Sequence, residues 1–510
     1  MTNLSNNSNI FADLAQSAYN DRKNLEDKLY NFSNGLSPRQ QQDLRDGKSV
    51  EFDFGSGGKV YLQPDTTLKT TDEGSKGLLT DSEAGYNSYF VTDTPNLDYS
   101  TKDTYFVTRG SDGISLANRN DWIDNNIVFA LSDSYIPQAQ LANAAMAGKM
   151  AEMHIRAPYA QMNVTGHSLG TMISIQAVAN LPQIYIDSIG KVVLFQGPDA
   201  RSSIEKMGAA AKANIEKLEA QGKIDYYVNA FDMVSMLNRN QKGVDEIGNV
   251  HYLLPANLAY TNTLYTKNSS HDFGMYEFNP DGTIKEATIE ANPEIFVAGI
   301  RLSKLIRETI DDLKATYHVS EEEAINILMS AKYRKGEYAK IVAEFAYKYK
   351  VIIEDAKRSN KTEARISSLK SSIKSSSGAK KIRLRTDLVT VVSAKAKVLV
   401  DEYKMILDNE LTETEDEIDA VVKDVQQGAY FIQSALPSWE VDNMIQNYQK
   451  DDFWDSGVKA SIQKKAKTFQ EKLIDFADTL DVVSMGIEDY DTKAGGELFK
   501  NELKIQGKVK

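Results

Sequence analysis

The chain has 510 residues, of which 41% are hydrophobic and 26% are charged, with a net charge of −13 and no cysteine. The length predicts two domains, because a single hydrophobic core rarely serves more than about 300 residues. The absence of cysteine excludes disulfides, a thiol nucleophile and thiolate metal ligands. The acidic balance argues against nucleic acid as a partner and against membrane binding through charge alone.

The N-terminal sequence is not expected to act as a Sec signal peptide. Residues 1–14, MTNLSNNSNIFADL, have neither a basic start nor an apolar core. No apolar run anywhere approaches the length of about 18 residues that a membrane-spanning helix needs. We therefore expect no transmembrane segment, and either export by a non-Sec route or a cytoplasmic location.

The first part of the chain has the pattern of an α/β domain. Residues 1–45 are expected to be helical and polar. From Val50 to Thr108, short β-branched and aromatic runs separated by Gly, Pro, Asp and Asn predict strands, namely VEFDF, KVYLQ, YNSYFVTD and DTYFVTRG. From Ile136 onward helices and strands alternate, which predicts a mostly parallel sheet covered on both faces. We expect this α/β domain to span residues 1–292.

The strand pattern ends near Pro293. Beyond it, Ala, Glu, Lys, Ile and Leu recur with a period near 3.6, and Pro and Gly are few. A stretch rich in Ser, Lys and Arg, Lys357–Arg385, is expected to be a loop between two long helices. Residues 293–510 are therefore expected to form an all-α domain of long helices with a targeting or interaction role.

The run NVTGHSLGTM contains the motif G-x-S-x-G, with Ser168 between Gly166 and Gly170. It follows a predicted strand and begins a predicted helix, which is the context of a nucleophile elbow. The elbow predicts that Ser168 is a catalytic nucleophile in an α/β-hydrolase domain. The alternative is a serine that caps the helix in an ordinary strand-to-helix turn.

An α/β-hydrolase carries its acid on a strand after the nucleophile and its histidine later still. Asp232 ends the apolar strand sequence IDYYVNAFDMVSML, so its carboxylate is expected at the carboxyl end of that strand. Asp199, in FQGPDARS, ends the preceding predicted strand and remains an alternative acid.

The chain has five histidines, so the general base can be sought by elimination. His167 lies inside the elbow motif and precedes the acid, which excludes it as the base. His271, in NSSHDFGMYEF, is expected in a polar loop just before a short strand, YEFNPDG, and is favoured because catalytic residues gather on loops. His251, in GNVHYLLP, remains the alternative.

The oxyanion needs backbone N–H donors. Leu169, directly after the nucleophile, and Ser111, in TYFVTRGSDG, are the expected donors. The predicted chemistry is acyl transfer to water, with no metal and no cofactor. Apolar segments at 121–131 and 251–265 are interpreted as a lid and an acyl groove, which favours a lipid ester, although ordinary core is an equal alternative.

Together these motifs resemble the class 3 lipases over roughly residues 1–290. The resemblance rests on V-T-R-G-S at 107–111, Asp121-Trp122, G-H-S-L-G at 166–170, D-M-V-S at 232–235 and then His271. In that family the R-G-T or R-G-S loop supplies an oxyanion donor and D-x-V carries the triad acid. Here serine replaces the commoner threonine at position 111, which leaves the backbone donor in place.

The layout of the whole chain is similar to phospholipase toxins that Gram-positive bacteria export by type VII secretion, with a C-terminal helical domain related to the LXG module. Trp454–Gly457 resembles the tryptophan–glycine turn of small type VII substrates, although its spacing departs from W-x-G. The resemblance implies a secreted antibacterial phospholipase A, small helical export partners and an immunity protein. Alternatives are a thioesterase or peptidase with the same triad, and a non-enzymatic export or interaction protein that carries a relic hydrolase domain.

Overall fold

A computed structural model of the chain divides into two compact units, residues 1–288 with 298–353 and residues 289–297 with 354–510. The residues that it describes are 9–19, 32, 36–54, 58–71, 74–110, 135–240, 245–256, 269–272, 274–329, 333, 335–431, 438–446 and 448–506. The sequence predicts that residues 1–292 and 293–510 fold as independent domains, and this stays a prediction.

The first unit is built on a mixed β-sheet. Its strands are β1 (Val50–Asp53), β2 (Lys59–Leu62), β3 (Lys69–Thr71), β4 (Gly74–Lys76), β5 (Thr80–Asp81), β6 (Tyr86–Thr92), β7 (Asp103–Thr108), β8 (Gln161–His167), β9 (Ile189–Phe195), β10 (Ile224–Val228) and β11 (Asn249–Tyr252). They lie in the order β11-β10-β9-β8-β7-β6-β5-β4-β3, and β2 pairs with both β6 and β1. Strands β7 to β11 run parallel, whereas β6 pairs antiparallel with its neighbours.

Helices cover both faces of this sheet. Those that lie wholly in the first unit are α1 (Ile10–Ser17), α2 (Pro38–Arg45), α5 (Pro137–Arg156), α6 (Leu169–Ala179), α7 (Gln183–Ile186), α8 (Arg201–Met207), α9 (Ala209–Ala220) and α11 (Glu321–Met329). Two further helices, α10 (Pro293–Tyr317) and α12 (Ala339–Lys374), belong to it in part. Six of the seven β8 residues are buried, as expected for a parallel strand with helices on both sides.

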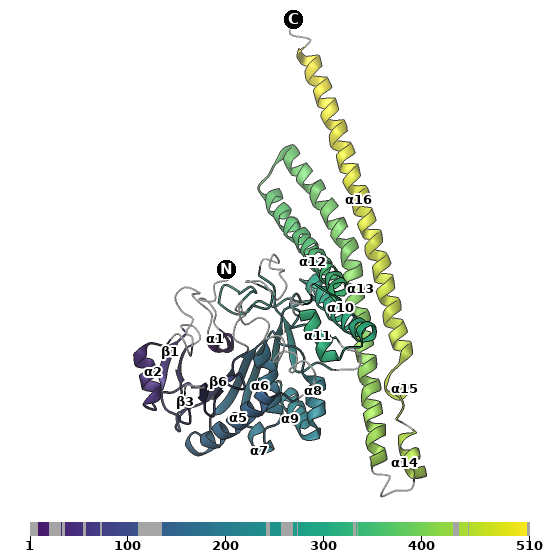
Figure 1. The fold of residues 1–510 in the computed structure, drawn as a ribbon. Helices are drawn as coiled ribbons and strands as arrows, with labels where there is room; N and C mark the ends of the chain where they lie inside the picture. The colour runs from purple at the N-terminus through teal and green to yellow at the C-terminus, as the bar shows by residue number, and fades with distance from the viewer. Residues whose placement is uncertain are drawn as a thin grey trace. The chain divides into compact units, whose positions relative to one another are not determined.

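The side chains of β7 show which helix covers which face. Val107 packs in one apolar cluster with Leu14 of α1. The Thr104 hydroxyl donates to the sulfur of Met153 in α5, at 3.3 Å. Because strand residues three apart point to opposite faces, α1 and α5 lie on opposite sides of the sheet, as Figure 1 shows. The α/β class that the sequence predicts is confirmed.

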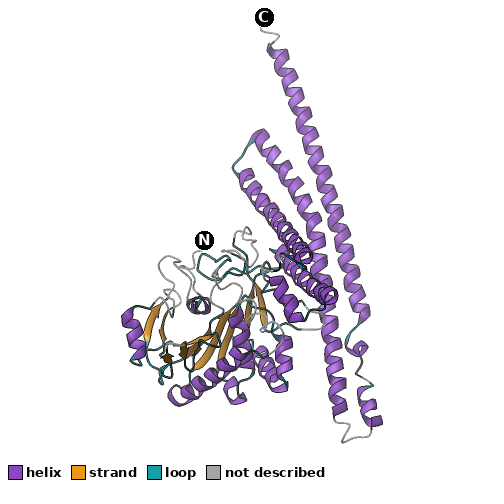
Figure 2. Cartoon of the chain, viewed as in Figure 1, coloured by secondary structure: helices purple, strands orange, loops and turns teal. Residues whose placement is uncertain are grey.

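In the residues that the structure describes, all the regular secondary structure of the second unit is helical. Besides parts of α10 and α12 it holds α13 (Gly378–Phe431), α14 (Ser438–Ile445), α15 (Lys450–Phe453) and α16 (Ser456–Gln506), and Figure 2 shows no strand among them. The Ser393 hydroxyl donates to the Ala477 carbonyl at 2.8 Å, and the Thr390 and Ser484 hydroxyls lie 2.8 Å apart. These contacts set α13 and α16 antiparallel. Among the described helices, none is both long and apolar enough to cross a membrane.

Two expectations from the sequence are wrong. The stretch Lys357–Arg385 is helical except at 375–377, because Lys and Arg are good helix formers and only the three serines interrupt the pattern. The residues after His271, expected to form a short strand, make isolated β-bridges instead, Pro255 with Tyr276 and Phe278 with Ile284.

Candidate active site

Ser168 lies at the junction between β8 and α6, at the carboxyl end of a central parallel strand. It has φ 59° and ψ −130°, a backbone conformation that residues with a side chain rarely adopt. Such strain costs about 1–3 kcal/mol and persists only where the surroundings enforce it. The strand, the strained serine and the buried helix together form a nucleophile elbow in an α/β-hydrolase fold.

The two glycines of the motif allow the elbow to form. A Cβ on Gly166 would lie 2.5 Å from the Gly170 carbonyl oxygen. A Cβ on Gly170 would lie 2.5 Å from the Thr108 carbonyl oxygen and 3.0 Å from the Gly110 nitrogen. Any side chain at either position would therefore push backbone against backbone, so the turn needs glycine on both sides of Ser168.

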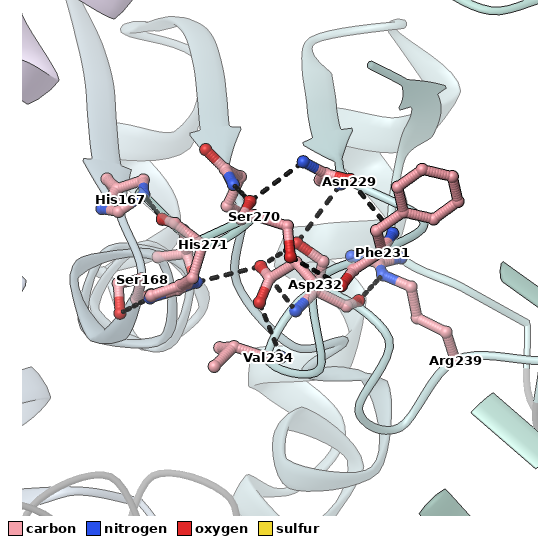
Figure 3. A network of polar contacts seen from close by, with 12 residues as sticks. His167, Ser168, Asn229, Phe231, Asp232, Val234, Arg239, Ser270 and His271 are labelled. Atoms are coloured by element: carbon pink, nitrogen blue, oxygen red, sulfur yellow. Dashed lines mark hydrogen bonds and ion pairs between the residues drawn. The ribbon is translucent and has the colours of Figure 1, made fainter. Parts of the chain in front are cut away.

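The fold brings the three predicted triad residues together. His271 Nε2 lies 2.8 Å from Ser168 Oγ, and His271 Nδ1 lies 2.9 Å from Asp232 Oδ2. Figure 3 shows the histidine between the serine and the carboxylate. The His271 side chain is 12% exposed and that of Asp232 is fully buried, so solvent reaches the imidazole and not the carboxylate.

The Asp232 carboxylate is oriented by its own turn after β10. Its Oδ1 accepts from the backbone N–H of Val234 at 3.0 Å. Its Oδ2 accepts from the Ser235 N–H at 3.1 Å and from the Ser235 hydroxyl at 2.5 Å, as well as facing His271. The D-M-V-S sequence therefore provides both the carboxylate and the donors that fix its direction.

A second set of hydrogen bonds joins the turn that carries Asp232 to the loop that carries His271. The Ser270 carbonyl accepts from the Asn229 amide at 2.9 Å and from the Gln196 amide at 2.7 Å. In return the Ser270 hydroxyl donates to the Phe231 carbonyl at 2.7 Å. Asn229 and Gln196 follow the parallel strands β10 and β9 directly, so the sheet itself holds the histidine loop (Figure 3).

His167 and Tyr19 are parts of the site that sequence reasoning missed. The His167 ring lies against that of His271, with centroids 5.1 Å apart. Its Nε2 lies 3.2 Å from the His271 carbonyl oxygen, and its Nδ1 lies 2.7 Å from the Tyr19 hydroxyl. The position of His167 next to the nucleophile is a signal that the sequence contains. Nothing in the sequence identifies Tyr19, which reaches the site from the end of α1.

The alternative base, His251, lies on β11 and has other partners. Its Nδ1 is 2.9 Å from Glu286 and its Nε2 is 3.4 Å from Asp225. The hydrogen bond with Asp225 raises the pKa of His251, while partial burial opposes the shift. Ser168 is not among the hydrogen-bond partners of His251.

The alternative acid, Asp199, is buried after β9 and holds backbone. It accepts from the N–H groups of Arg201 and Ile247, both at 2.9 Å, and its Oδ2 lies 3.9 Å from Arg239. Burial raises the pKa of Asp199, and the Arg239 charge opposes the shift. The histidine partner in this structure is Asp232.

Of the two expected oxyanion donors, Leu169 is the first residue of α6, where backbone N–H groups and the helix dipole favour negative charge. Ser111 lies outside the described residues, as do the predicted lid at 121–131 and the part of the predicted acyl groove from residue 257 on. The preceding residue, Gly110, is described. A Cβ there would lie 2.5 Å from the His167 carbonyl oxygen, so this loop approaches the elbow closely.

Within the described ranges, no group of three or more His, Asp or Glu side chains could hold a metal ion.

Comparisons with known proteins return only distant structural similarity. No protein-family model and no curated protein matches the chain. It is similar to a mutant form of MDLA from Penicillium cyclopium, at 18% identity over 55% of this chain and 85% of that chain, with a TM-score of 0.30. The Lip2 lipase from Yarrowia lipolytica is 14% identical over 48% of this chain and 78% of its own, with a TM-score of 0.27. The nonglycosylated form of that lipase is 15% identical over 48% and 77%, also with a TM-score of 0.27.

Proposed function

We propose that the first unit is a serine hydrolase that cleaves acyl esters of lipids, with Ser168 as nucleophile, His271 as general base and Asp232 as the acid that orients it. One observation carries the proposal: two hydrogen bonds, of 2.8 and 2.9 Å, join the strained serine through one imidazole to a buried carboxylate. Hydrogen bonds in this order are what nucleophilic acyl transfer requires.

In the acylation step, His271 Nε2 removes the Ser168 proton while Oγ bonds to the ester carbonyl carbon. The carbonyl oxygen becomes an oxyanion, which the backbone N–H groups of Leu169 and Ser111 stabilise. The C–O bond to the alcohol then breaks, and His271 returns its proton to the leaving oxygen. Throughout, Asp232 holds the tautomer of His271 and stabilises the charged imidazolium.

In the deacylation step, water takes the place of the alcohol. His271 removes a proton from the water as its oxygen attacks the acyl carbon, and the bond to Ser168 Oγ breaks. The serine regains its proton and a free fatty acid leaves. Each cycle therefore consumes one ester and one water and yields one alcohol and one acid, with no metal and no cofactor in the proposed chemistry.

The choice of substrate rests on the sequence around the site. The apolar segments at 121–131 and 251–265 suit an acyl chain, and the resemblance of the motifs to class 3 lipases points the same way. We propose a phospholipid substrate and phospholipase A activity. The layout of the whole chain further supports a secreted antibacterial toxin that leaves by type VII export, with small helical partners on the C-terminal helices and an immunity protein in the producing cell.

Hydrolysis of a defined phospholipid tests this proposal. Vesicles of a phosphatidylcholine with different acyl chains at the two positions are incubated with the purified protein and with Ser168→Ala, and the products are identified by mass spectrometry. We expect a free fatty acid and a lysophospholipid from the wild type only. Parallel reactions with a triacylglycerol, an acyl thioester and a peptide distinguish a lipase, a thioesterase and a peptidase, and turnover of none of the four would refute the hydrolase assignment.

A further inference from the structure

The carbonyl oxygen of Phe231 connects the turn that carries Asp232 with the loop that carries His271. Phe231 directly precedes Asp232, and its carbonyl accepts a hydrogen bond of 2.7 Å from the hydroxyl of Ser270, which directly precedes His271. The same oxygen accepts a second hydrogen bond, from the hydroxyl of Tyr349. One backbone oxygen thus has two side-chain donors, and the second donor comes from α12.

The Tyr349 side chain is fixed in position by burial and by packing against its neighbours on α12. It is 3% exposed and lies on a buried face of α12 with Phe345, Ile352 and Ile353, at the spacing of successive helical turns. The rings of Phe345 and Tyr349 stack, with centroids 6.1 Å apart and an angle of 14°. Burial raises the pKa of Tyr349, so its hydroxyl stays protonated and remains a donor. All four residues belong to the same compact unit as the sheet.

A carbonyl that is held by two donors fixes the peptide group between Phe231 and Asp232. The orientation of this peptide group sets the direction of the Asp232 Cα–Cβ bond. It therefore sets the geometry of the hydrogen bond between the Asp232 carboxylate and His271. Small misplacements in a catalytic site are costly, since a shift of about 1 Å can reduce a rate by about 10²-fold. The Ser270 hydroxyl and the Asn229 amide hold the two loops to each other, whereas the Tyr349 hydroxyl ties the turn that carries Asp232 to α12.

We propose that Tyr349 is a positioning residue for Asp232, so that one side chain of α12 supports the catalytic site. This inference rests on the proposed function. It places a required group 57 positions beyond residue 292, where the sequence predicts that the hydrolase domain ends. Through Tyr349, the helical region of the chain then contributes to catalysis, in addition to any role in export or partner binding.

The test compares two single-hydroxyl deletions in the full-length chain. Tyr349→Phe keeps the ring and its stacking with Phe345 and removes only the donor to Phe231. Tyr347→Phe is the matched control, because Tyr347 lies two positions away on the same helix and is 70% exposed. Hydrolysis of a soluble acyl ester is measured for both variants over a range of pH, with kcat and KM determined separately.

We expect Tyr349→Phe to lower kcat by about threefold to tenfold, which is the change that the loss of one hydrogen bond gives. KM should not change, because Tyr349 is buried and its hydroxyl donates to the Phe231 carbonyl. The acidic limb of the kcat/KM profile should move to lower pH, since a less well placed carboxylate stabilises the imidazolium less. A residue that merely stabilised the fold would change the unfolding temperature and leave this profile in place. Tyr347→Phe should match the wild type in every respect.

A double substitution, Tyr349→Phe with Ser270→Ala, adds a second readout. Because both hydroxyls serve one oxygen, the combined loss of kcat should differ from the product of the single losses. An active wild type with Tyr349→Phe equal to Tyr347→Phe in kcat and pH profile would overturn this inference alone. A wild type without esterase turnover would overturn the proposed function and this inference with it.

Discussion

The substitution Asp232→Asn tests the acid because it keeps the size of the side chain and removes its charge. In the structure Asp232 Oδ2 meets three donors, which are His271 Nδ1 at 2.9 Å and the hydroxyl and N–H of Ser235 at 2.5 and 3.1 Å. Asparagine has one oxygen and one NH₂ group. If its NH₂ replaces Oδ2, a donor faces His271 and favours the tautomer that cannot accept the serine proton. If its oxygen stays there, the NH₂ group faces the N–H of Val234.

The expected loss follows from this conflict. A histidine in the wrong tautomer lowers kcat by about 10⁴-fold, which corresponds to about 5.5 kcal/mol in the activation free energy. A buried donor without an acceptor lowers the free energy of unfolding by about 1–3 kcal/mol. Asp199→Asn is the control, because Asp199 is also buried but accepts from the backbone N–H groups of Arg201 and Ile247. It should lower stability to a similar degree and leave kcat near the wild-type value.

Ester hydrolysis at saturating substrate and urea unfolding are measured for both variants. The opposite pattern, in which Asp199→Asn loses kcat and Asp232→Asn keeps it within about tenfold of wild type, would refute the assignment of the acid.

Two further predictions concern the histidines. His271→Ala should reduce kcat by at least about 10³-fold. His251→Ala should leave most of the activity, because the ring of His251 is paired with Asp225 and Glu286. Residual rates in the reverse order would transfer the role of base to His251. The second prediction follows from the pKa of His251, which the hydrogen bond with Asp225 raises. A raised folded-state pKa stabilises the fold below the unfolded-state value of about 6.5, and this contribution is lost as pH rises through the folded-state pKa. His251→Gln should therefore lower the free energy of unfolding more at about pH 5.5 than at about pH 8.5, and an equal effect at both would contradict the pairing.

The nucleophile and acid positions could be predicted because both depend on local sequence. The glycines around Ser168 mark a turn that no other residue fits, and the apolar run before Asp232 marks where a parallel strand ends. Parallel strands bring their carboxyl ends to one edge of the sheet, so these residues were expected to approach each other. The expectation for His271 came from elimination among few histidines. Their catalytic roles stay predictions until the substitutions are measured.

The rest of the site depends on contacts between distant segments. Tyr19 and Tyr349 lie 148 positions before His167 and 118 positions after Phe231, and neither belongs to a motif. Helical periodicity predicts that Tyr349 lies on a buried face of its helix, but not which loop that face meets. The short strands β3 and β4 are not predicted, because their sequences KTT and GSK are polar and lack the alternation of apolar and polar residues that identifies a strand.

Covalent labelling of Ser168 tests the central claim most directly. A fluorophosphonate probe reacts with a serine only when a base activates its hydroxyl. The full-length protein, Ser168→Ala and His271→Ala are each incubated with the probe and digested, and the labelled peptide is identified by mass spectrometry. We predict that Ser168 is labelled in the wild type. Labelling should be strongly slowed in His271→Ala and absent in Ser168→Ala. A folded wild type that is not labelled, or that carries the label on a different serine, would contradict the account.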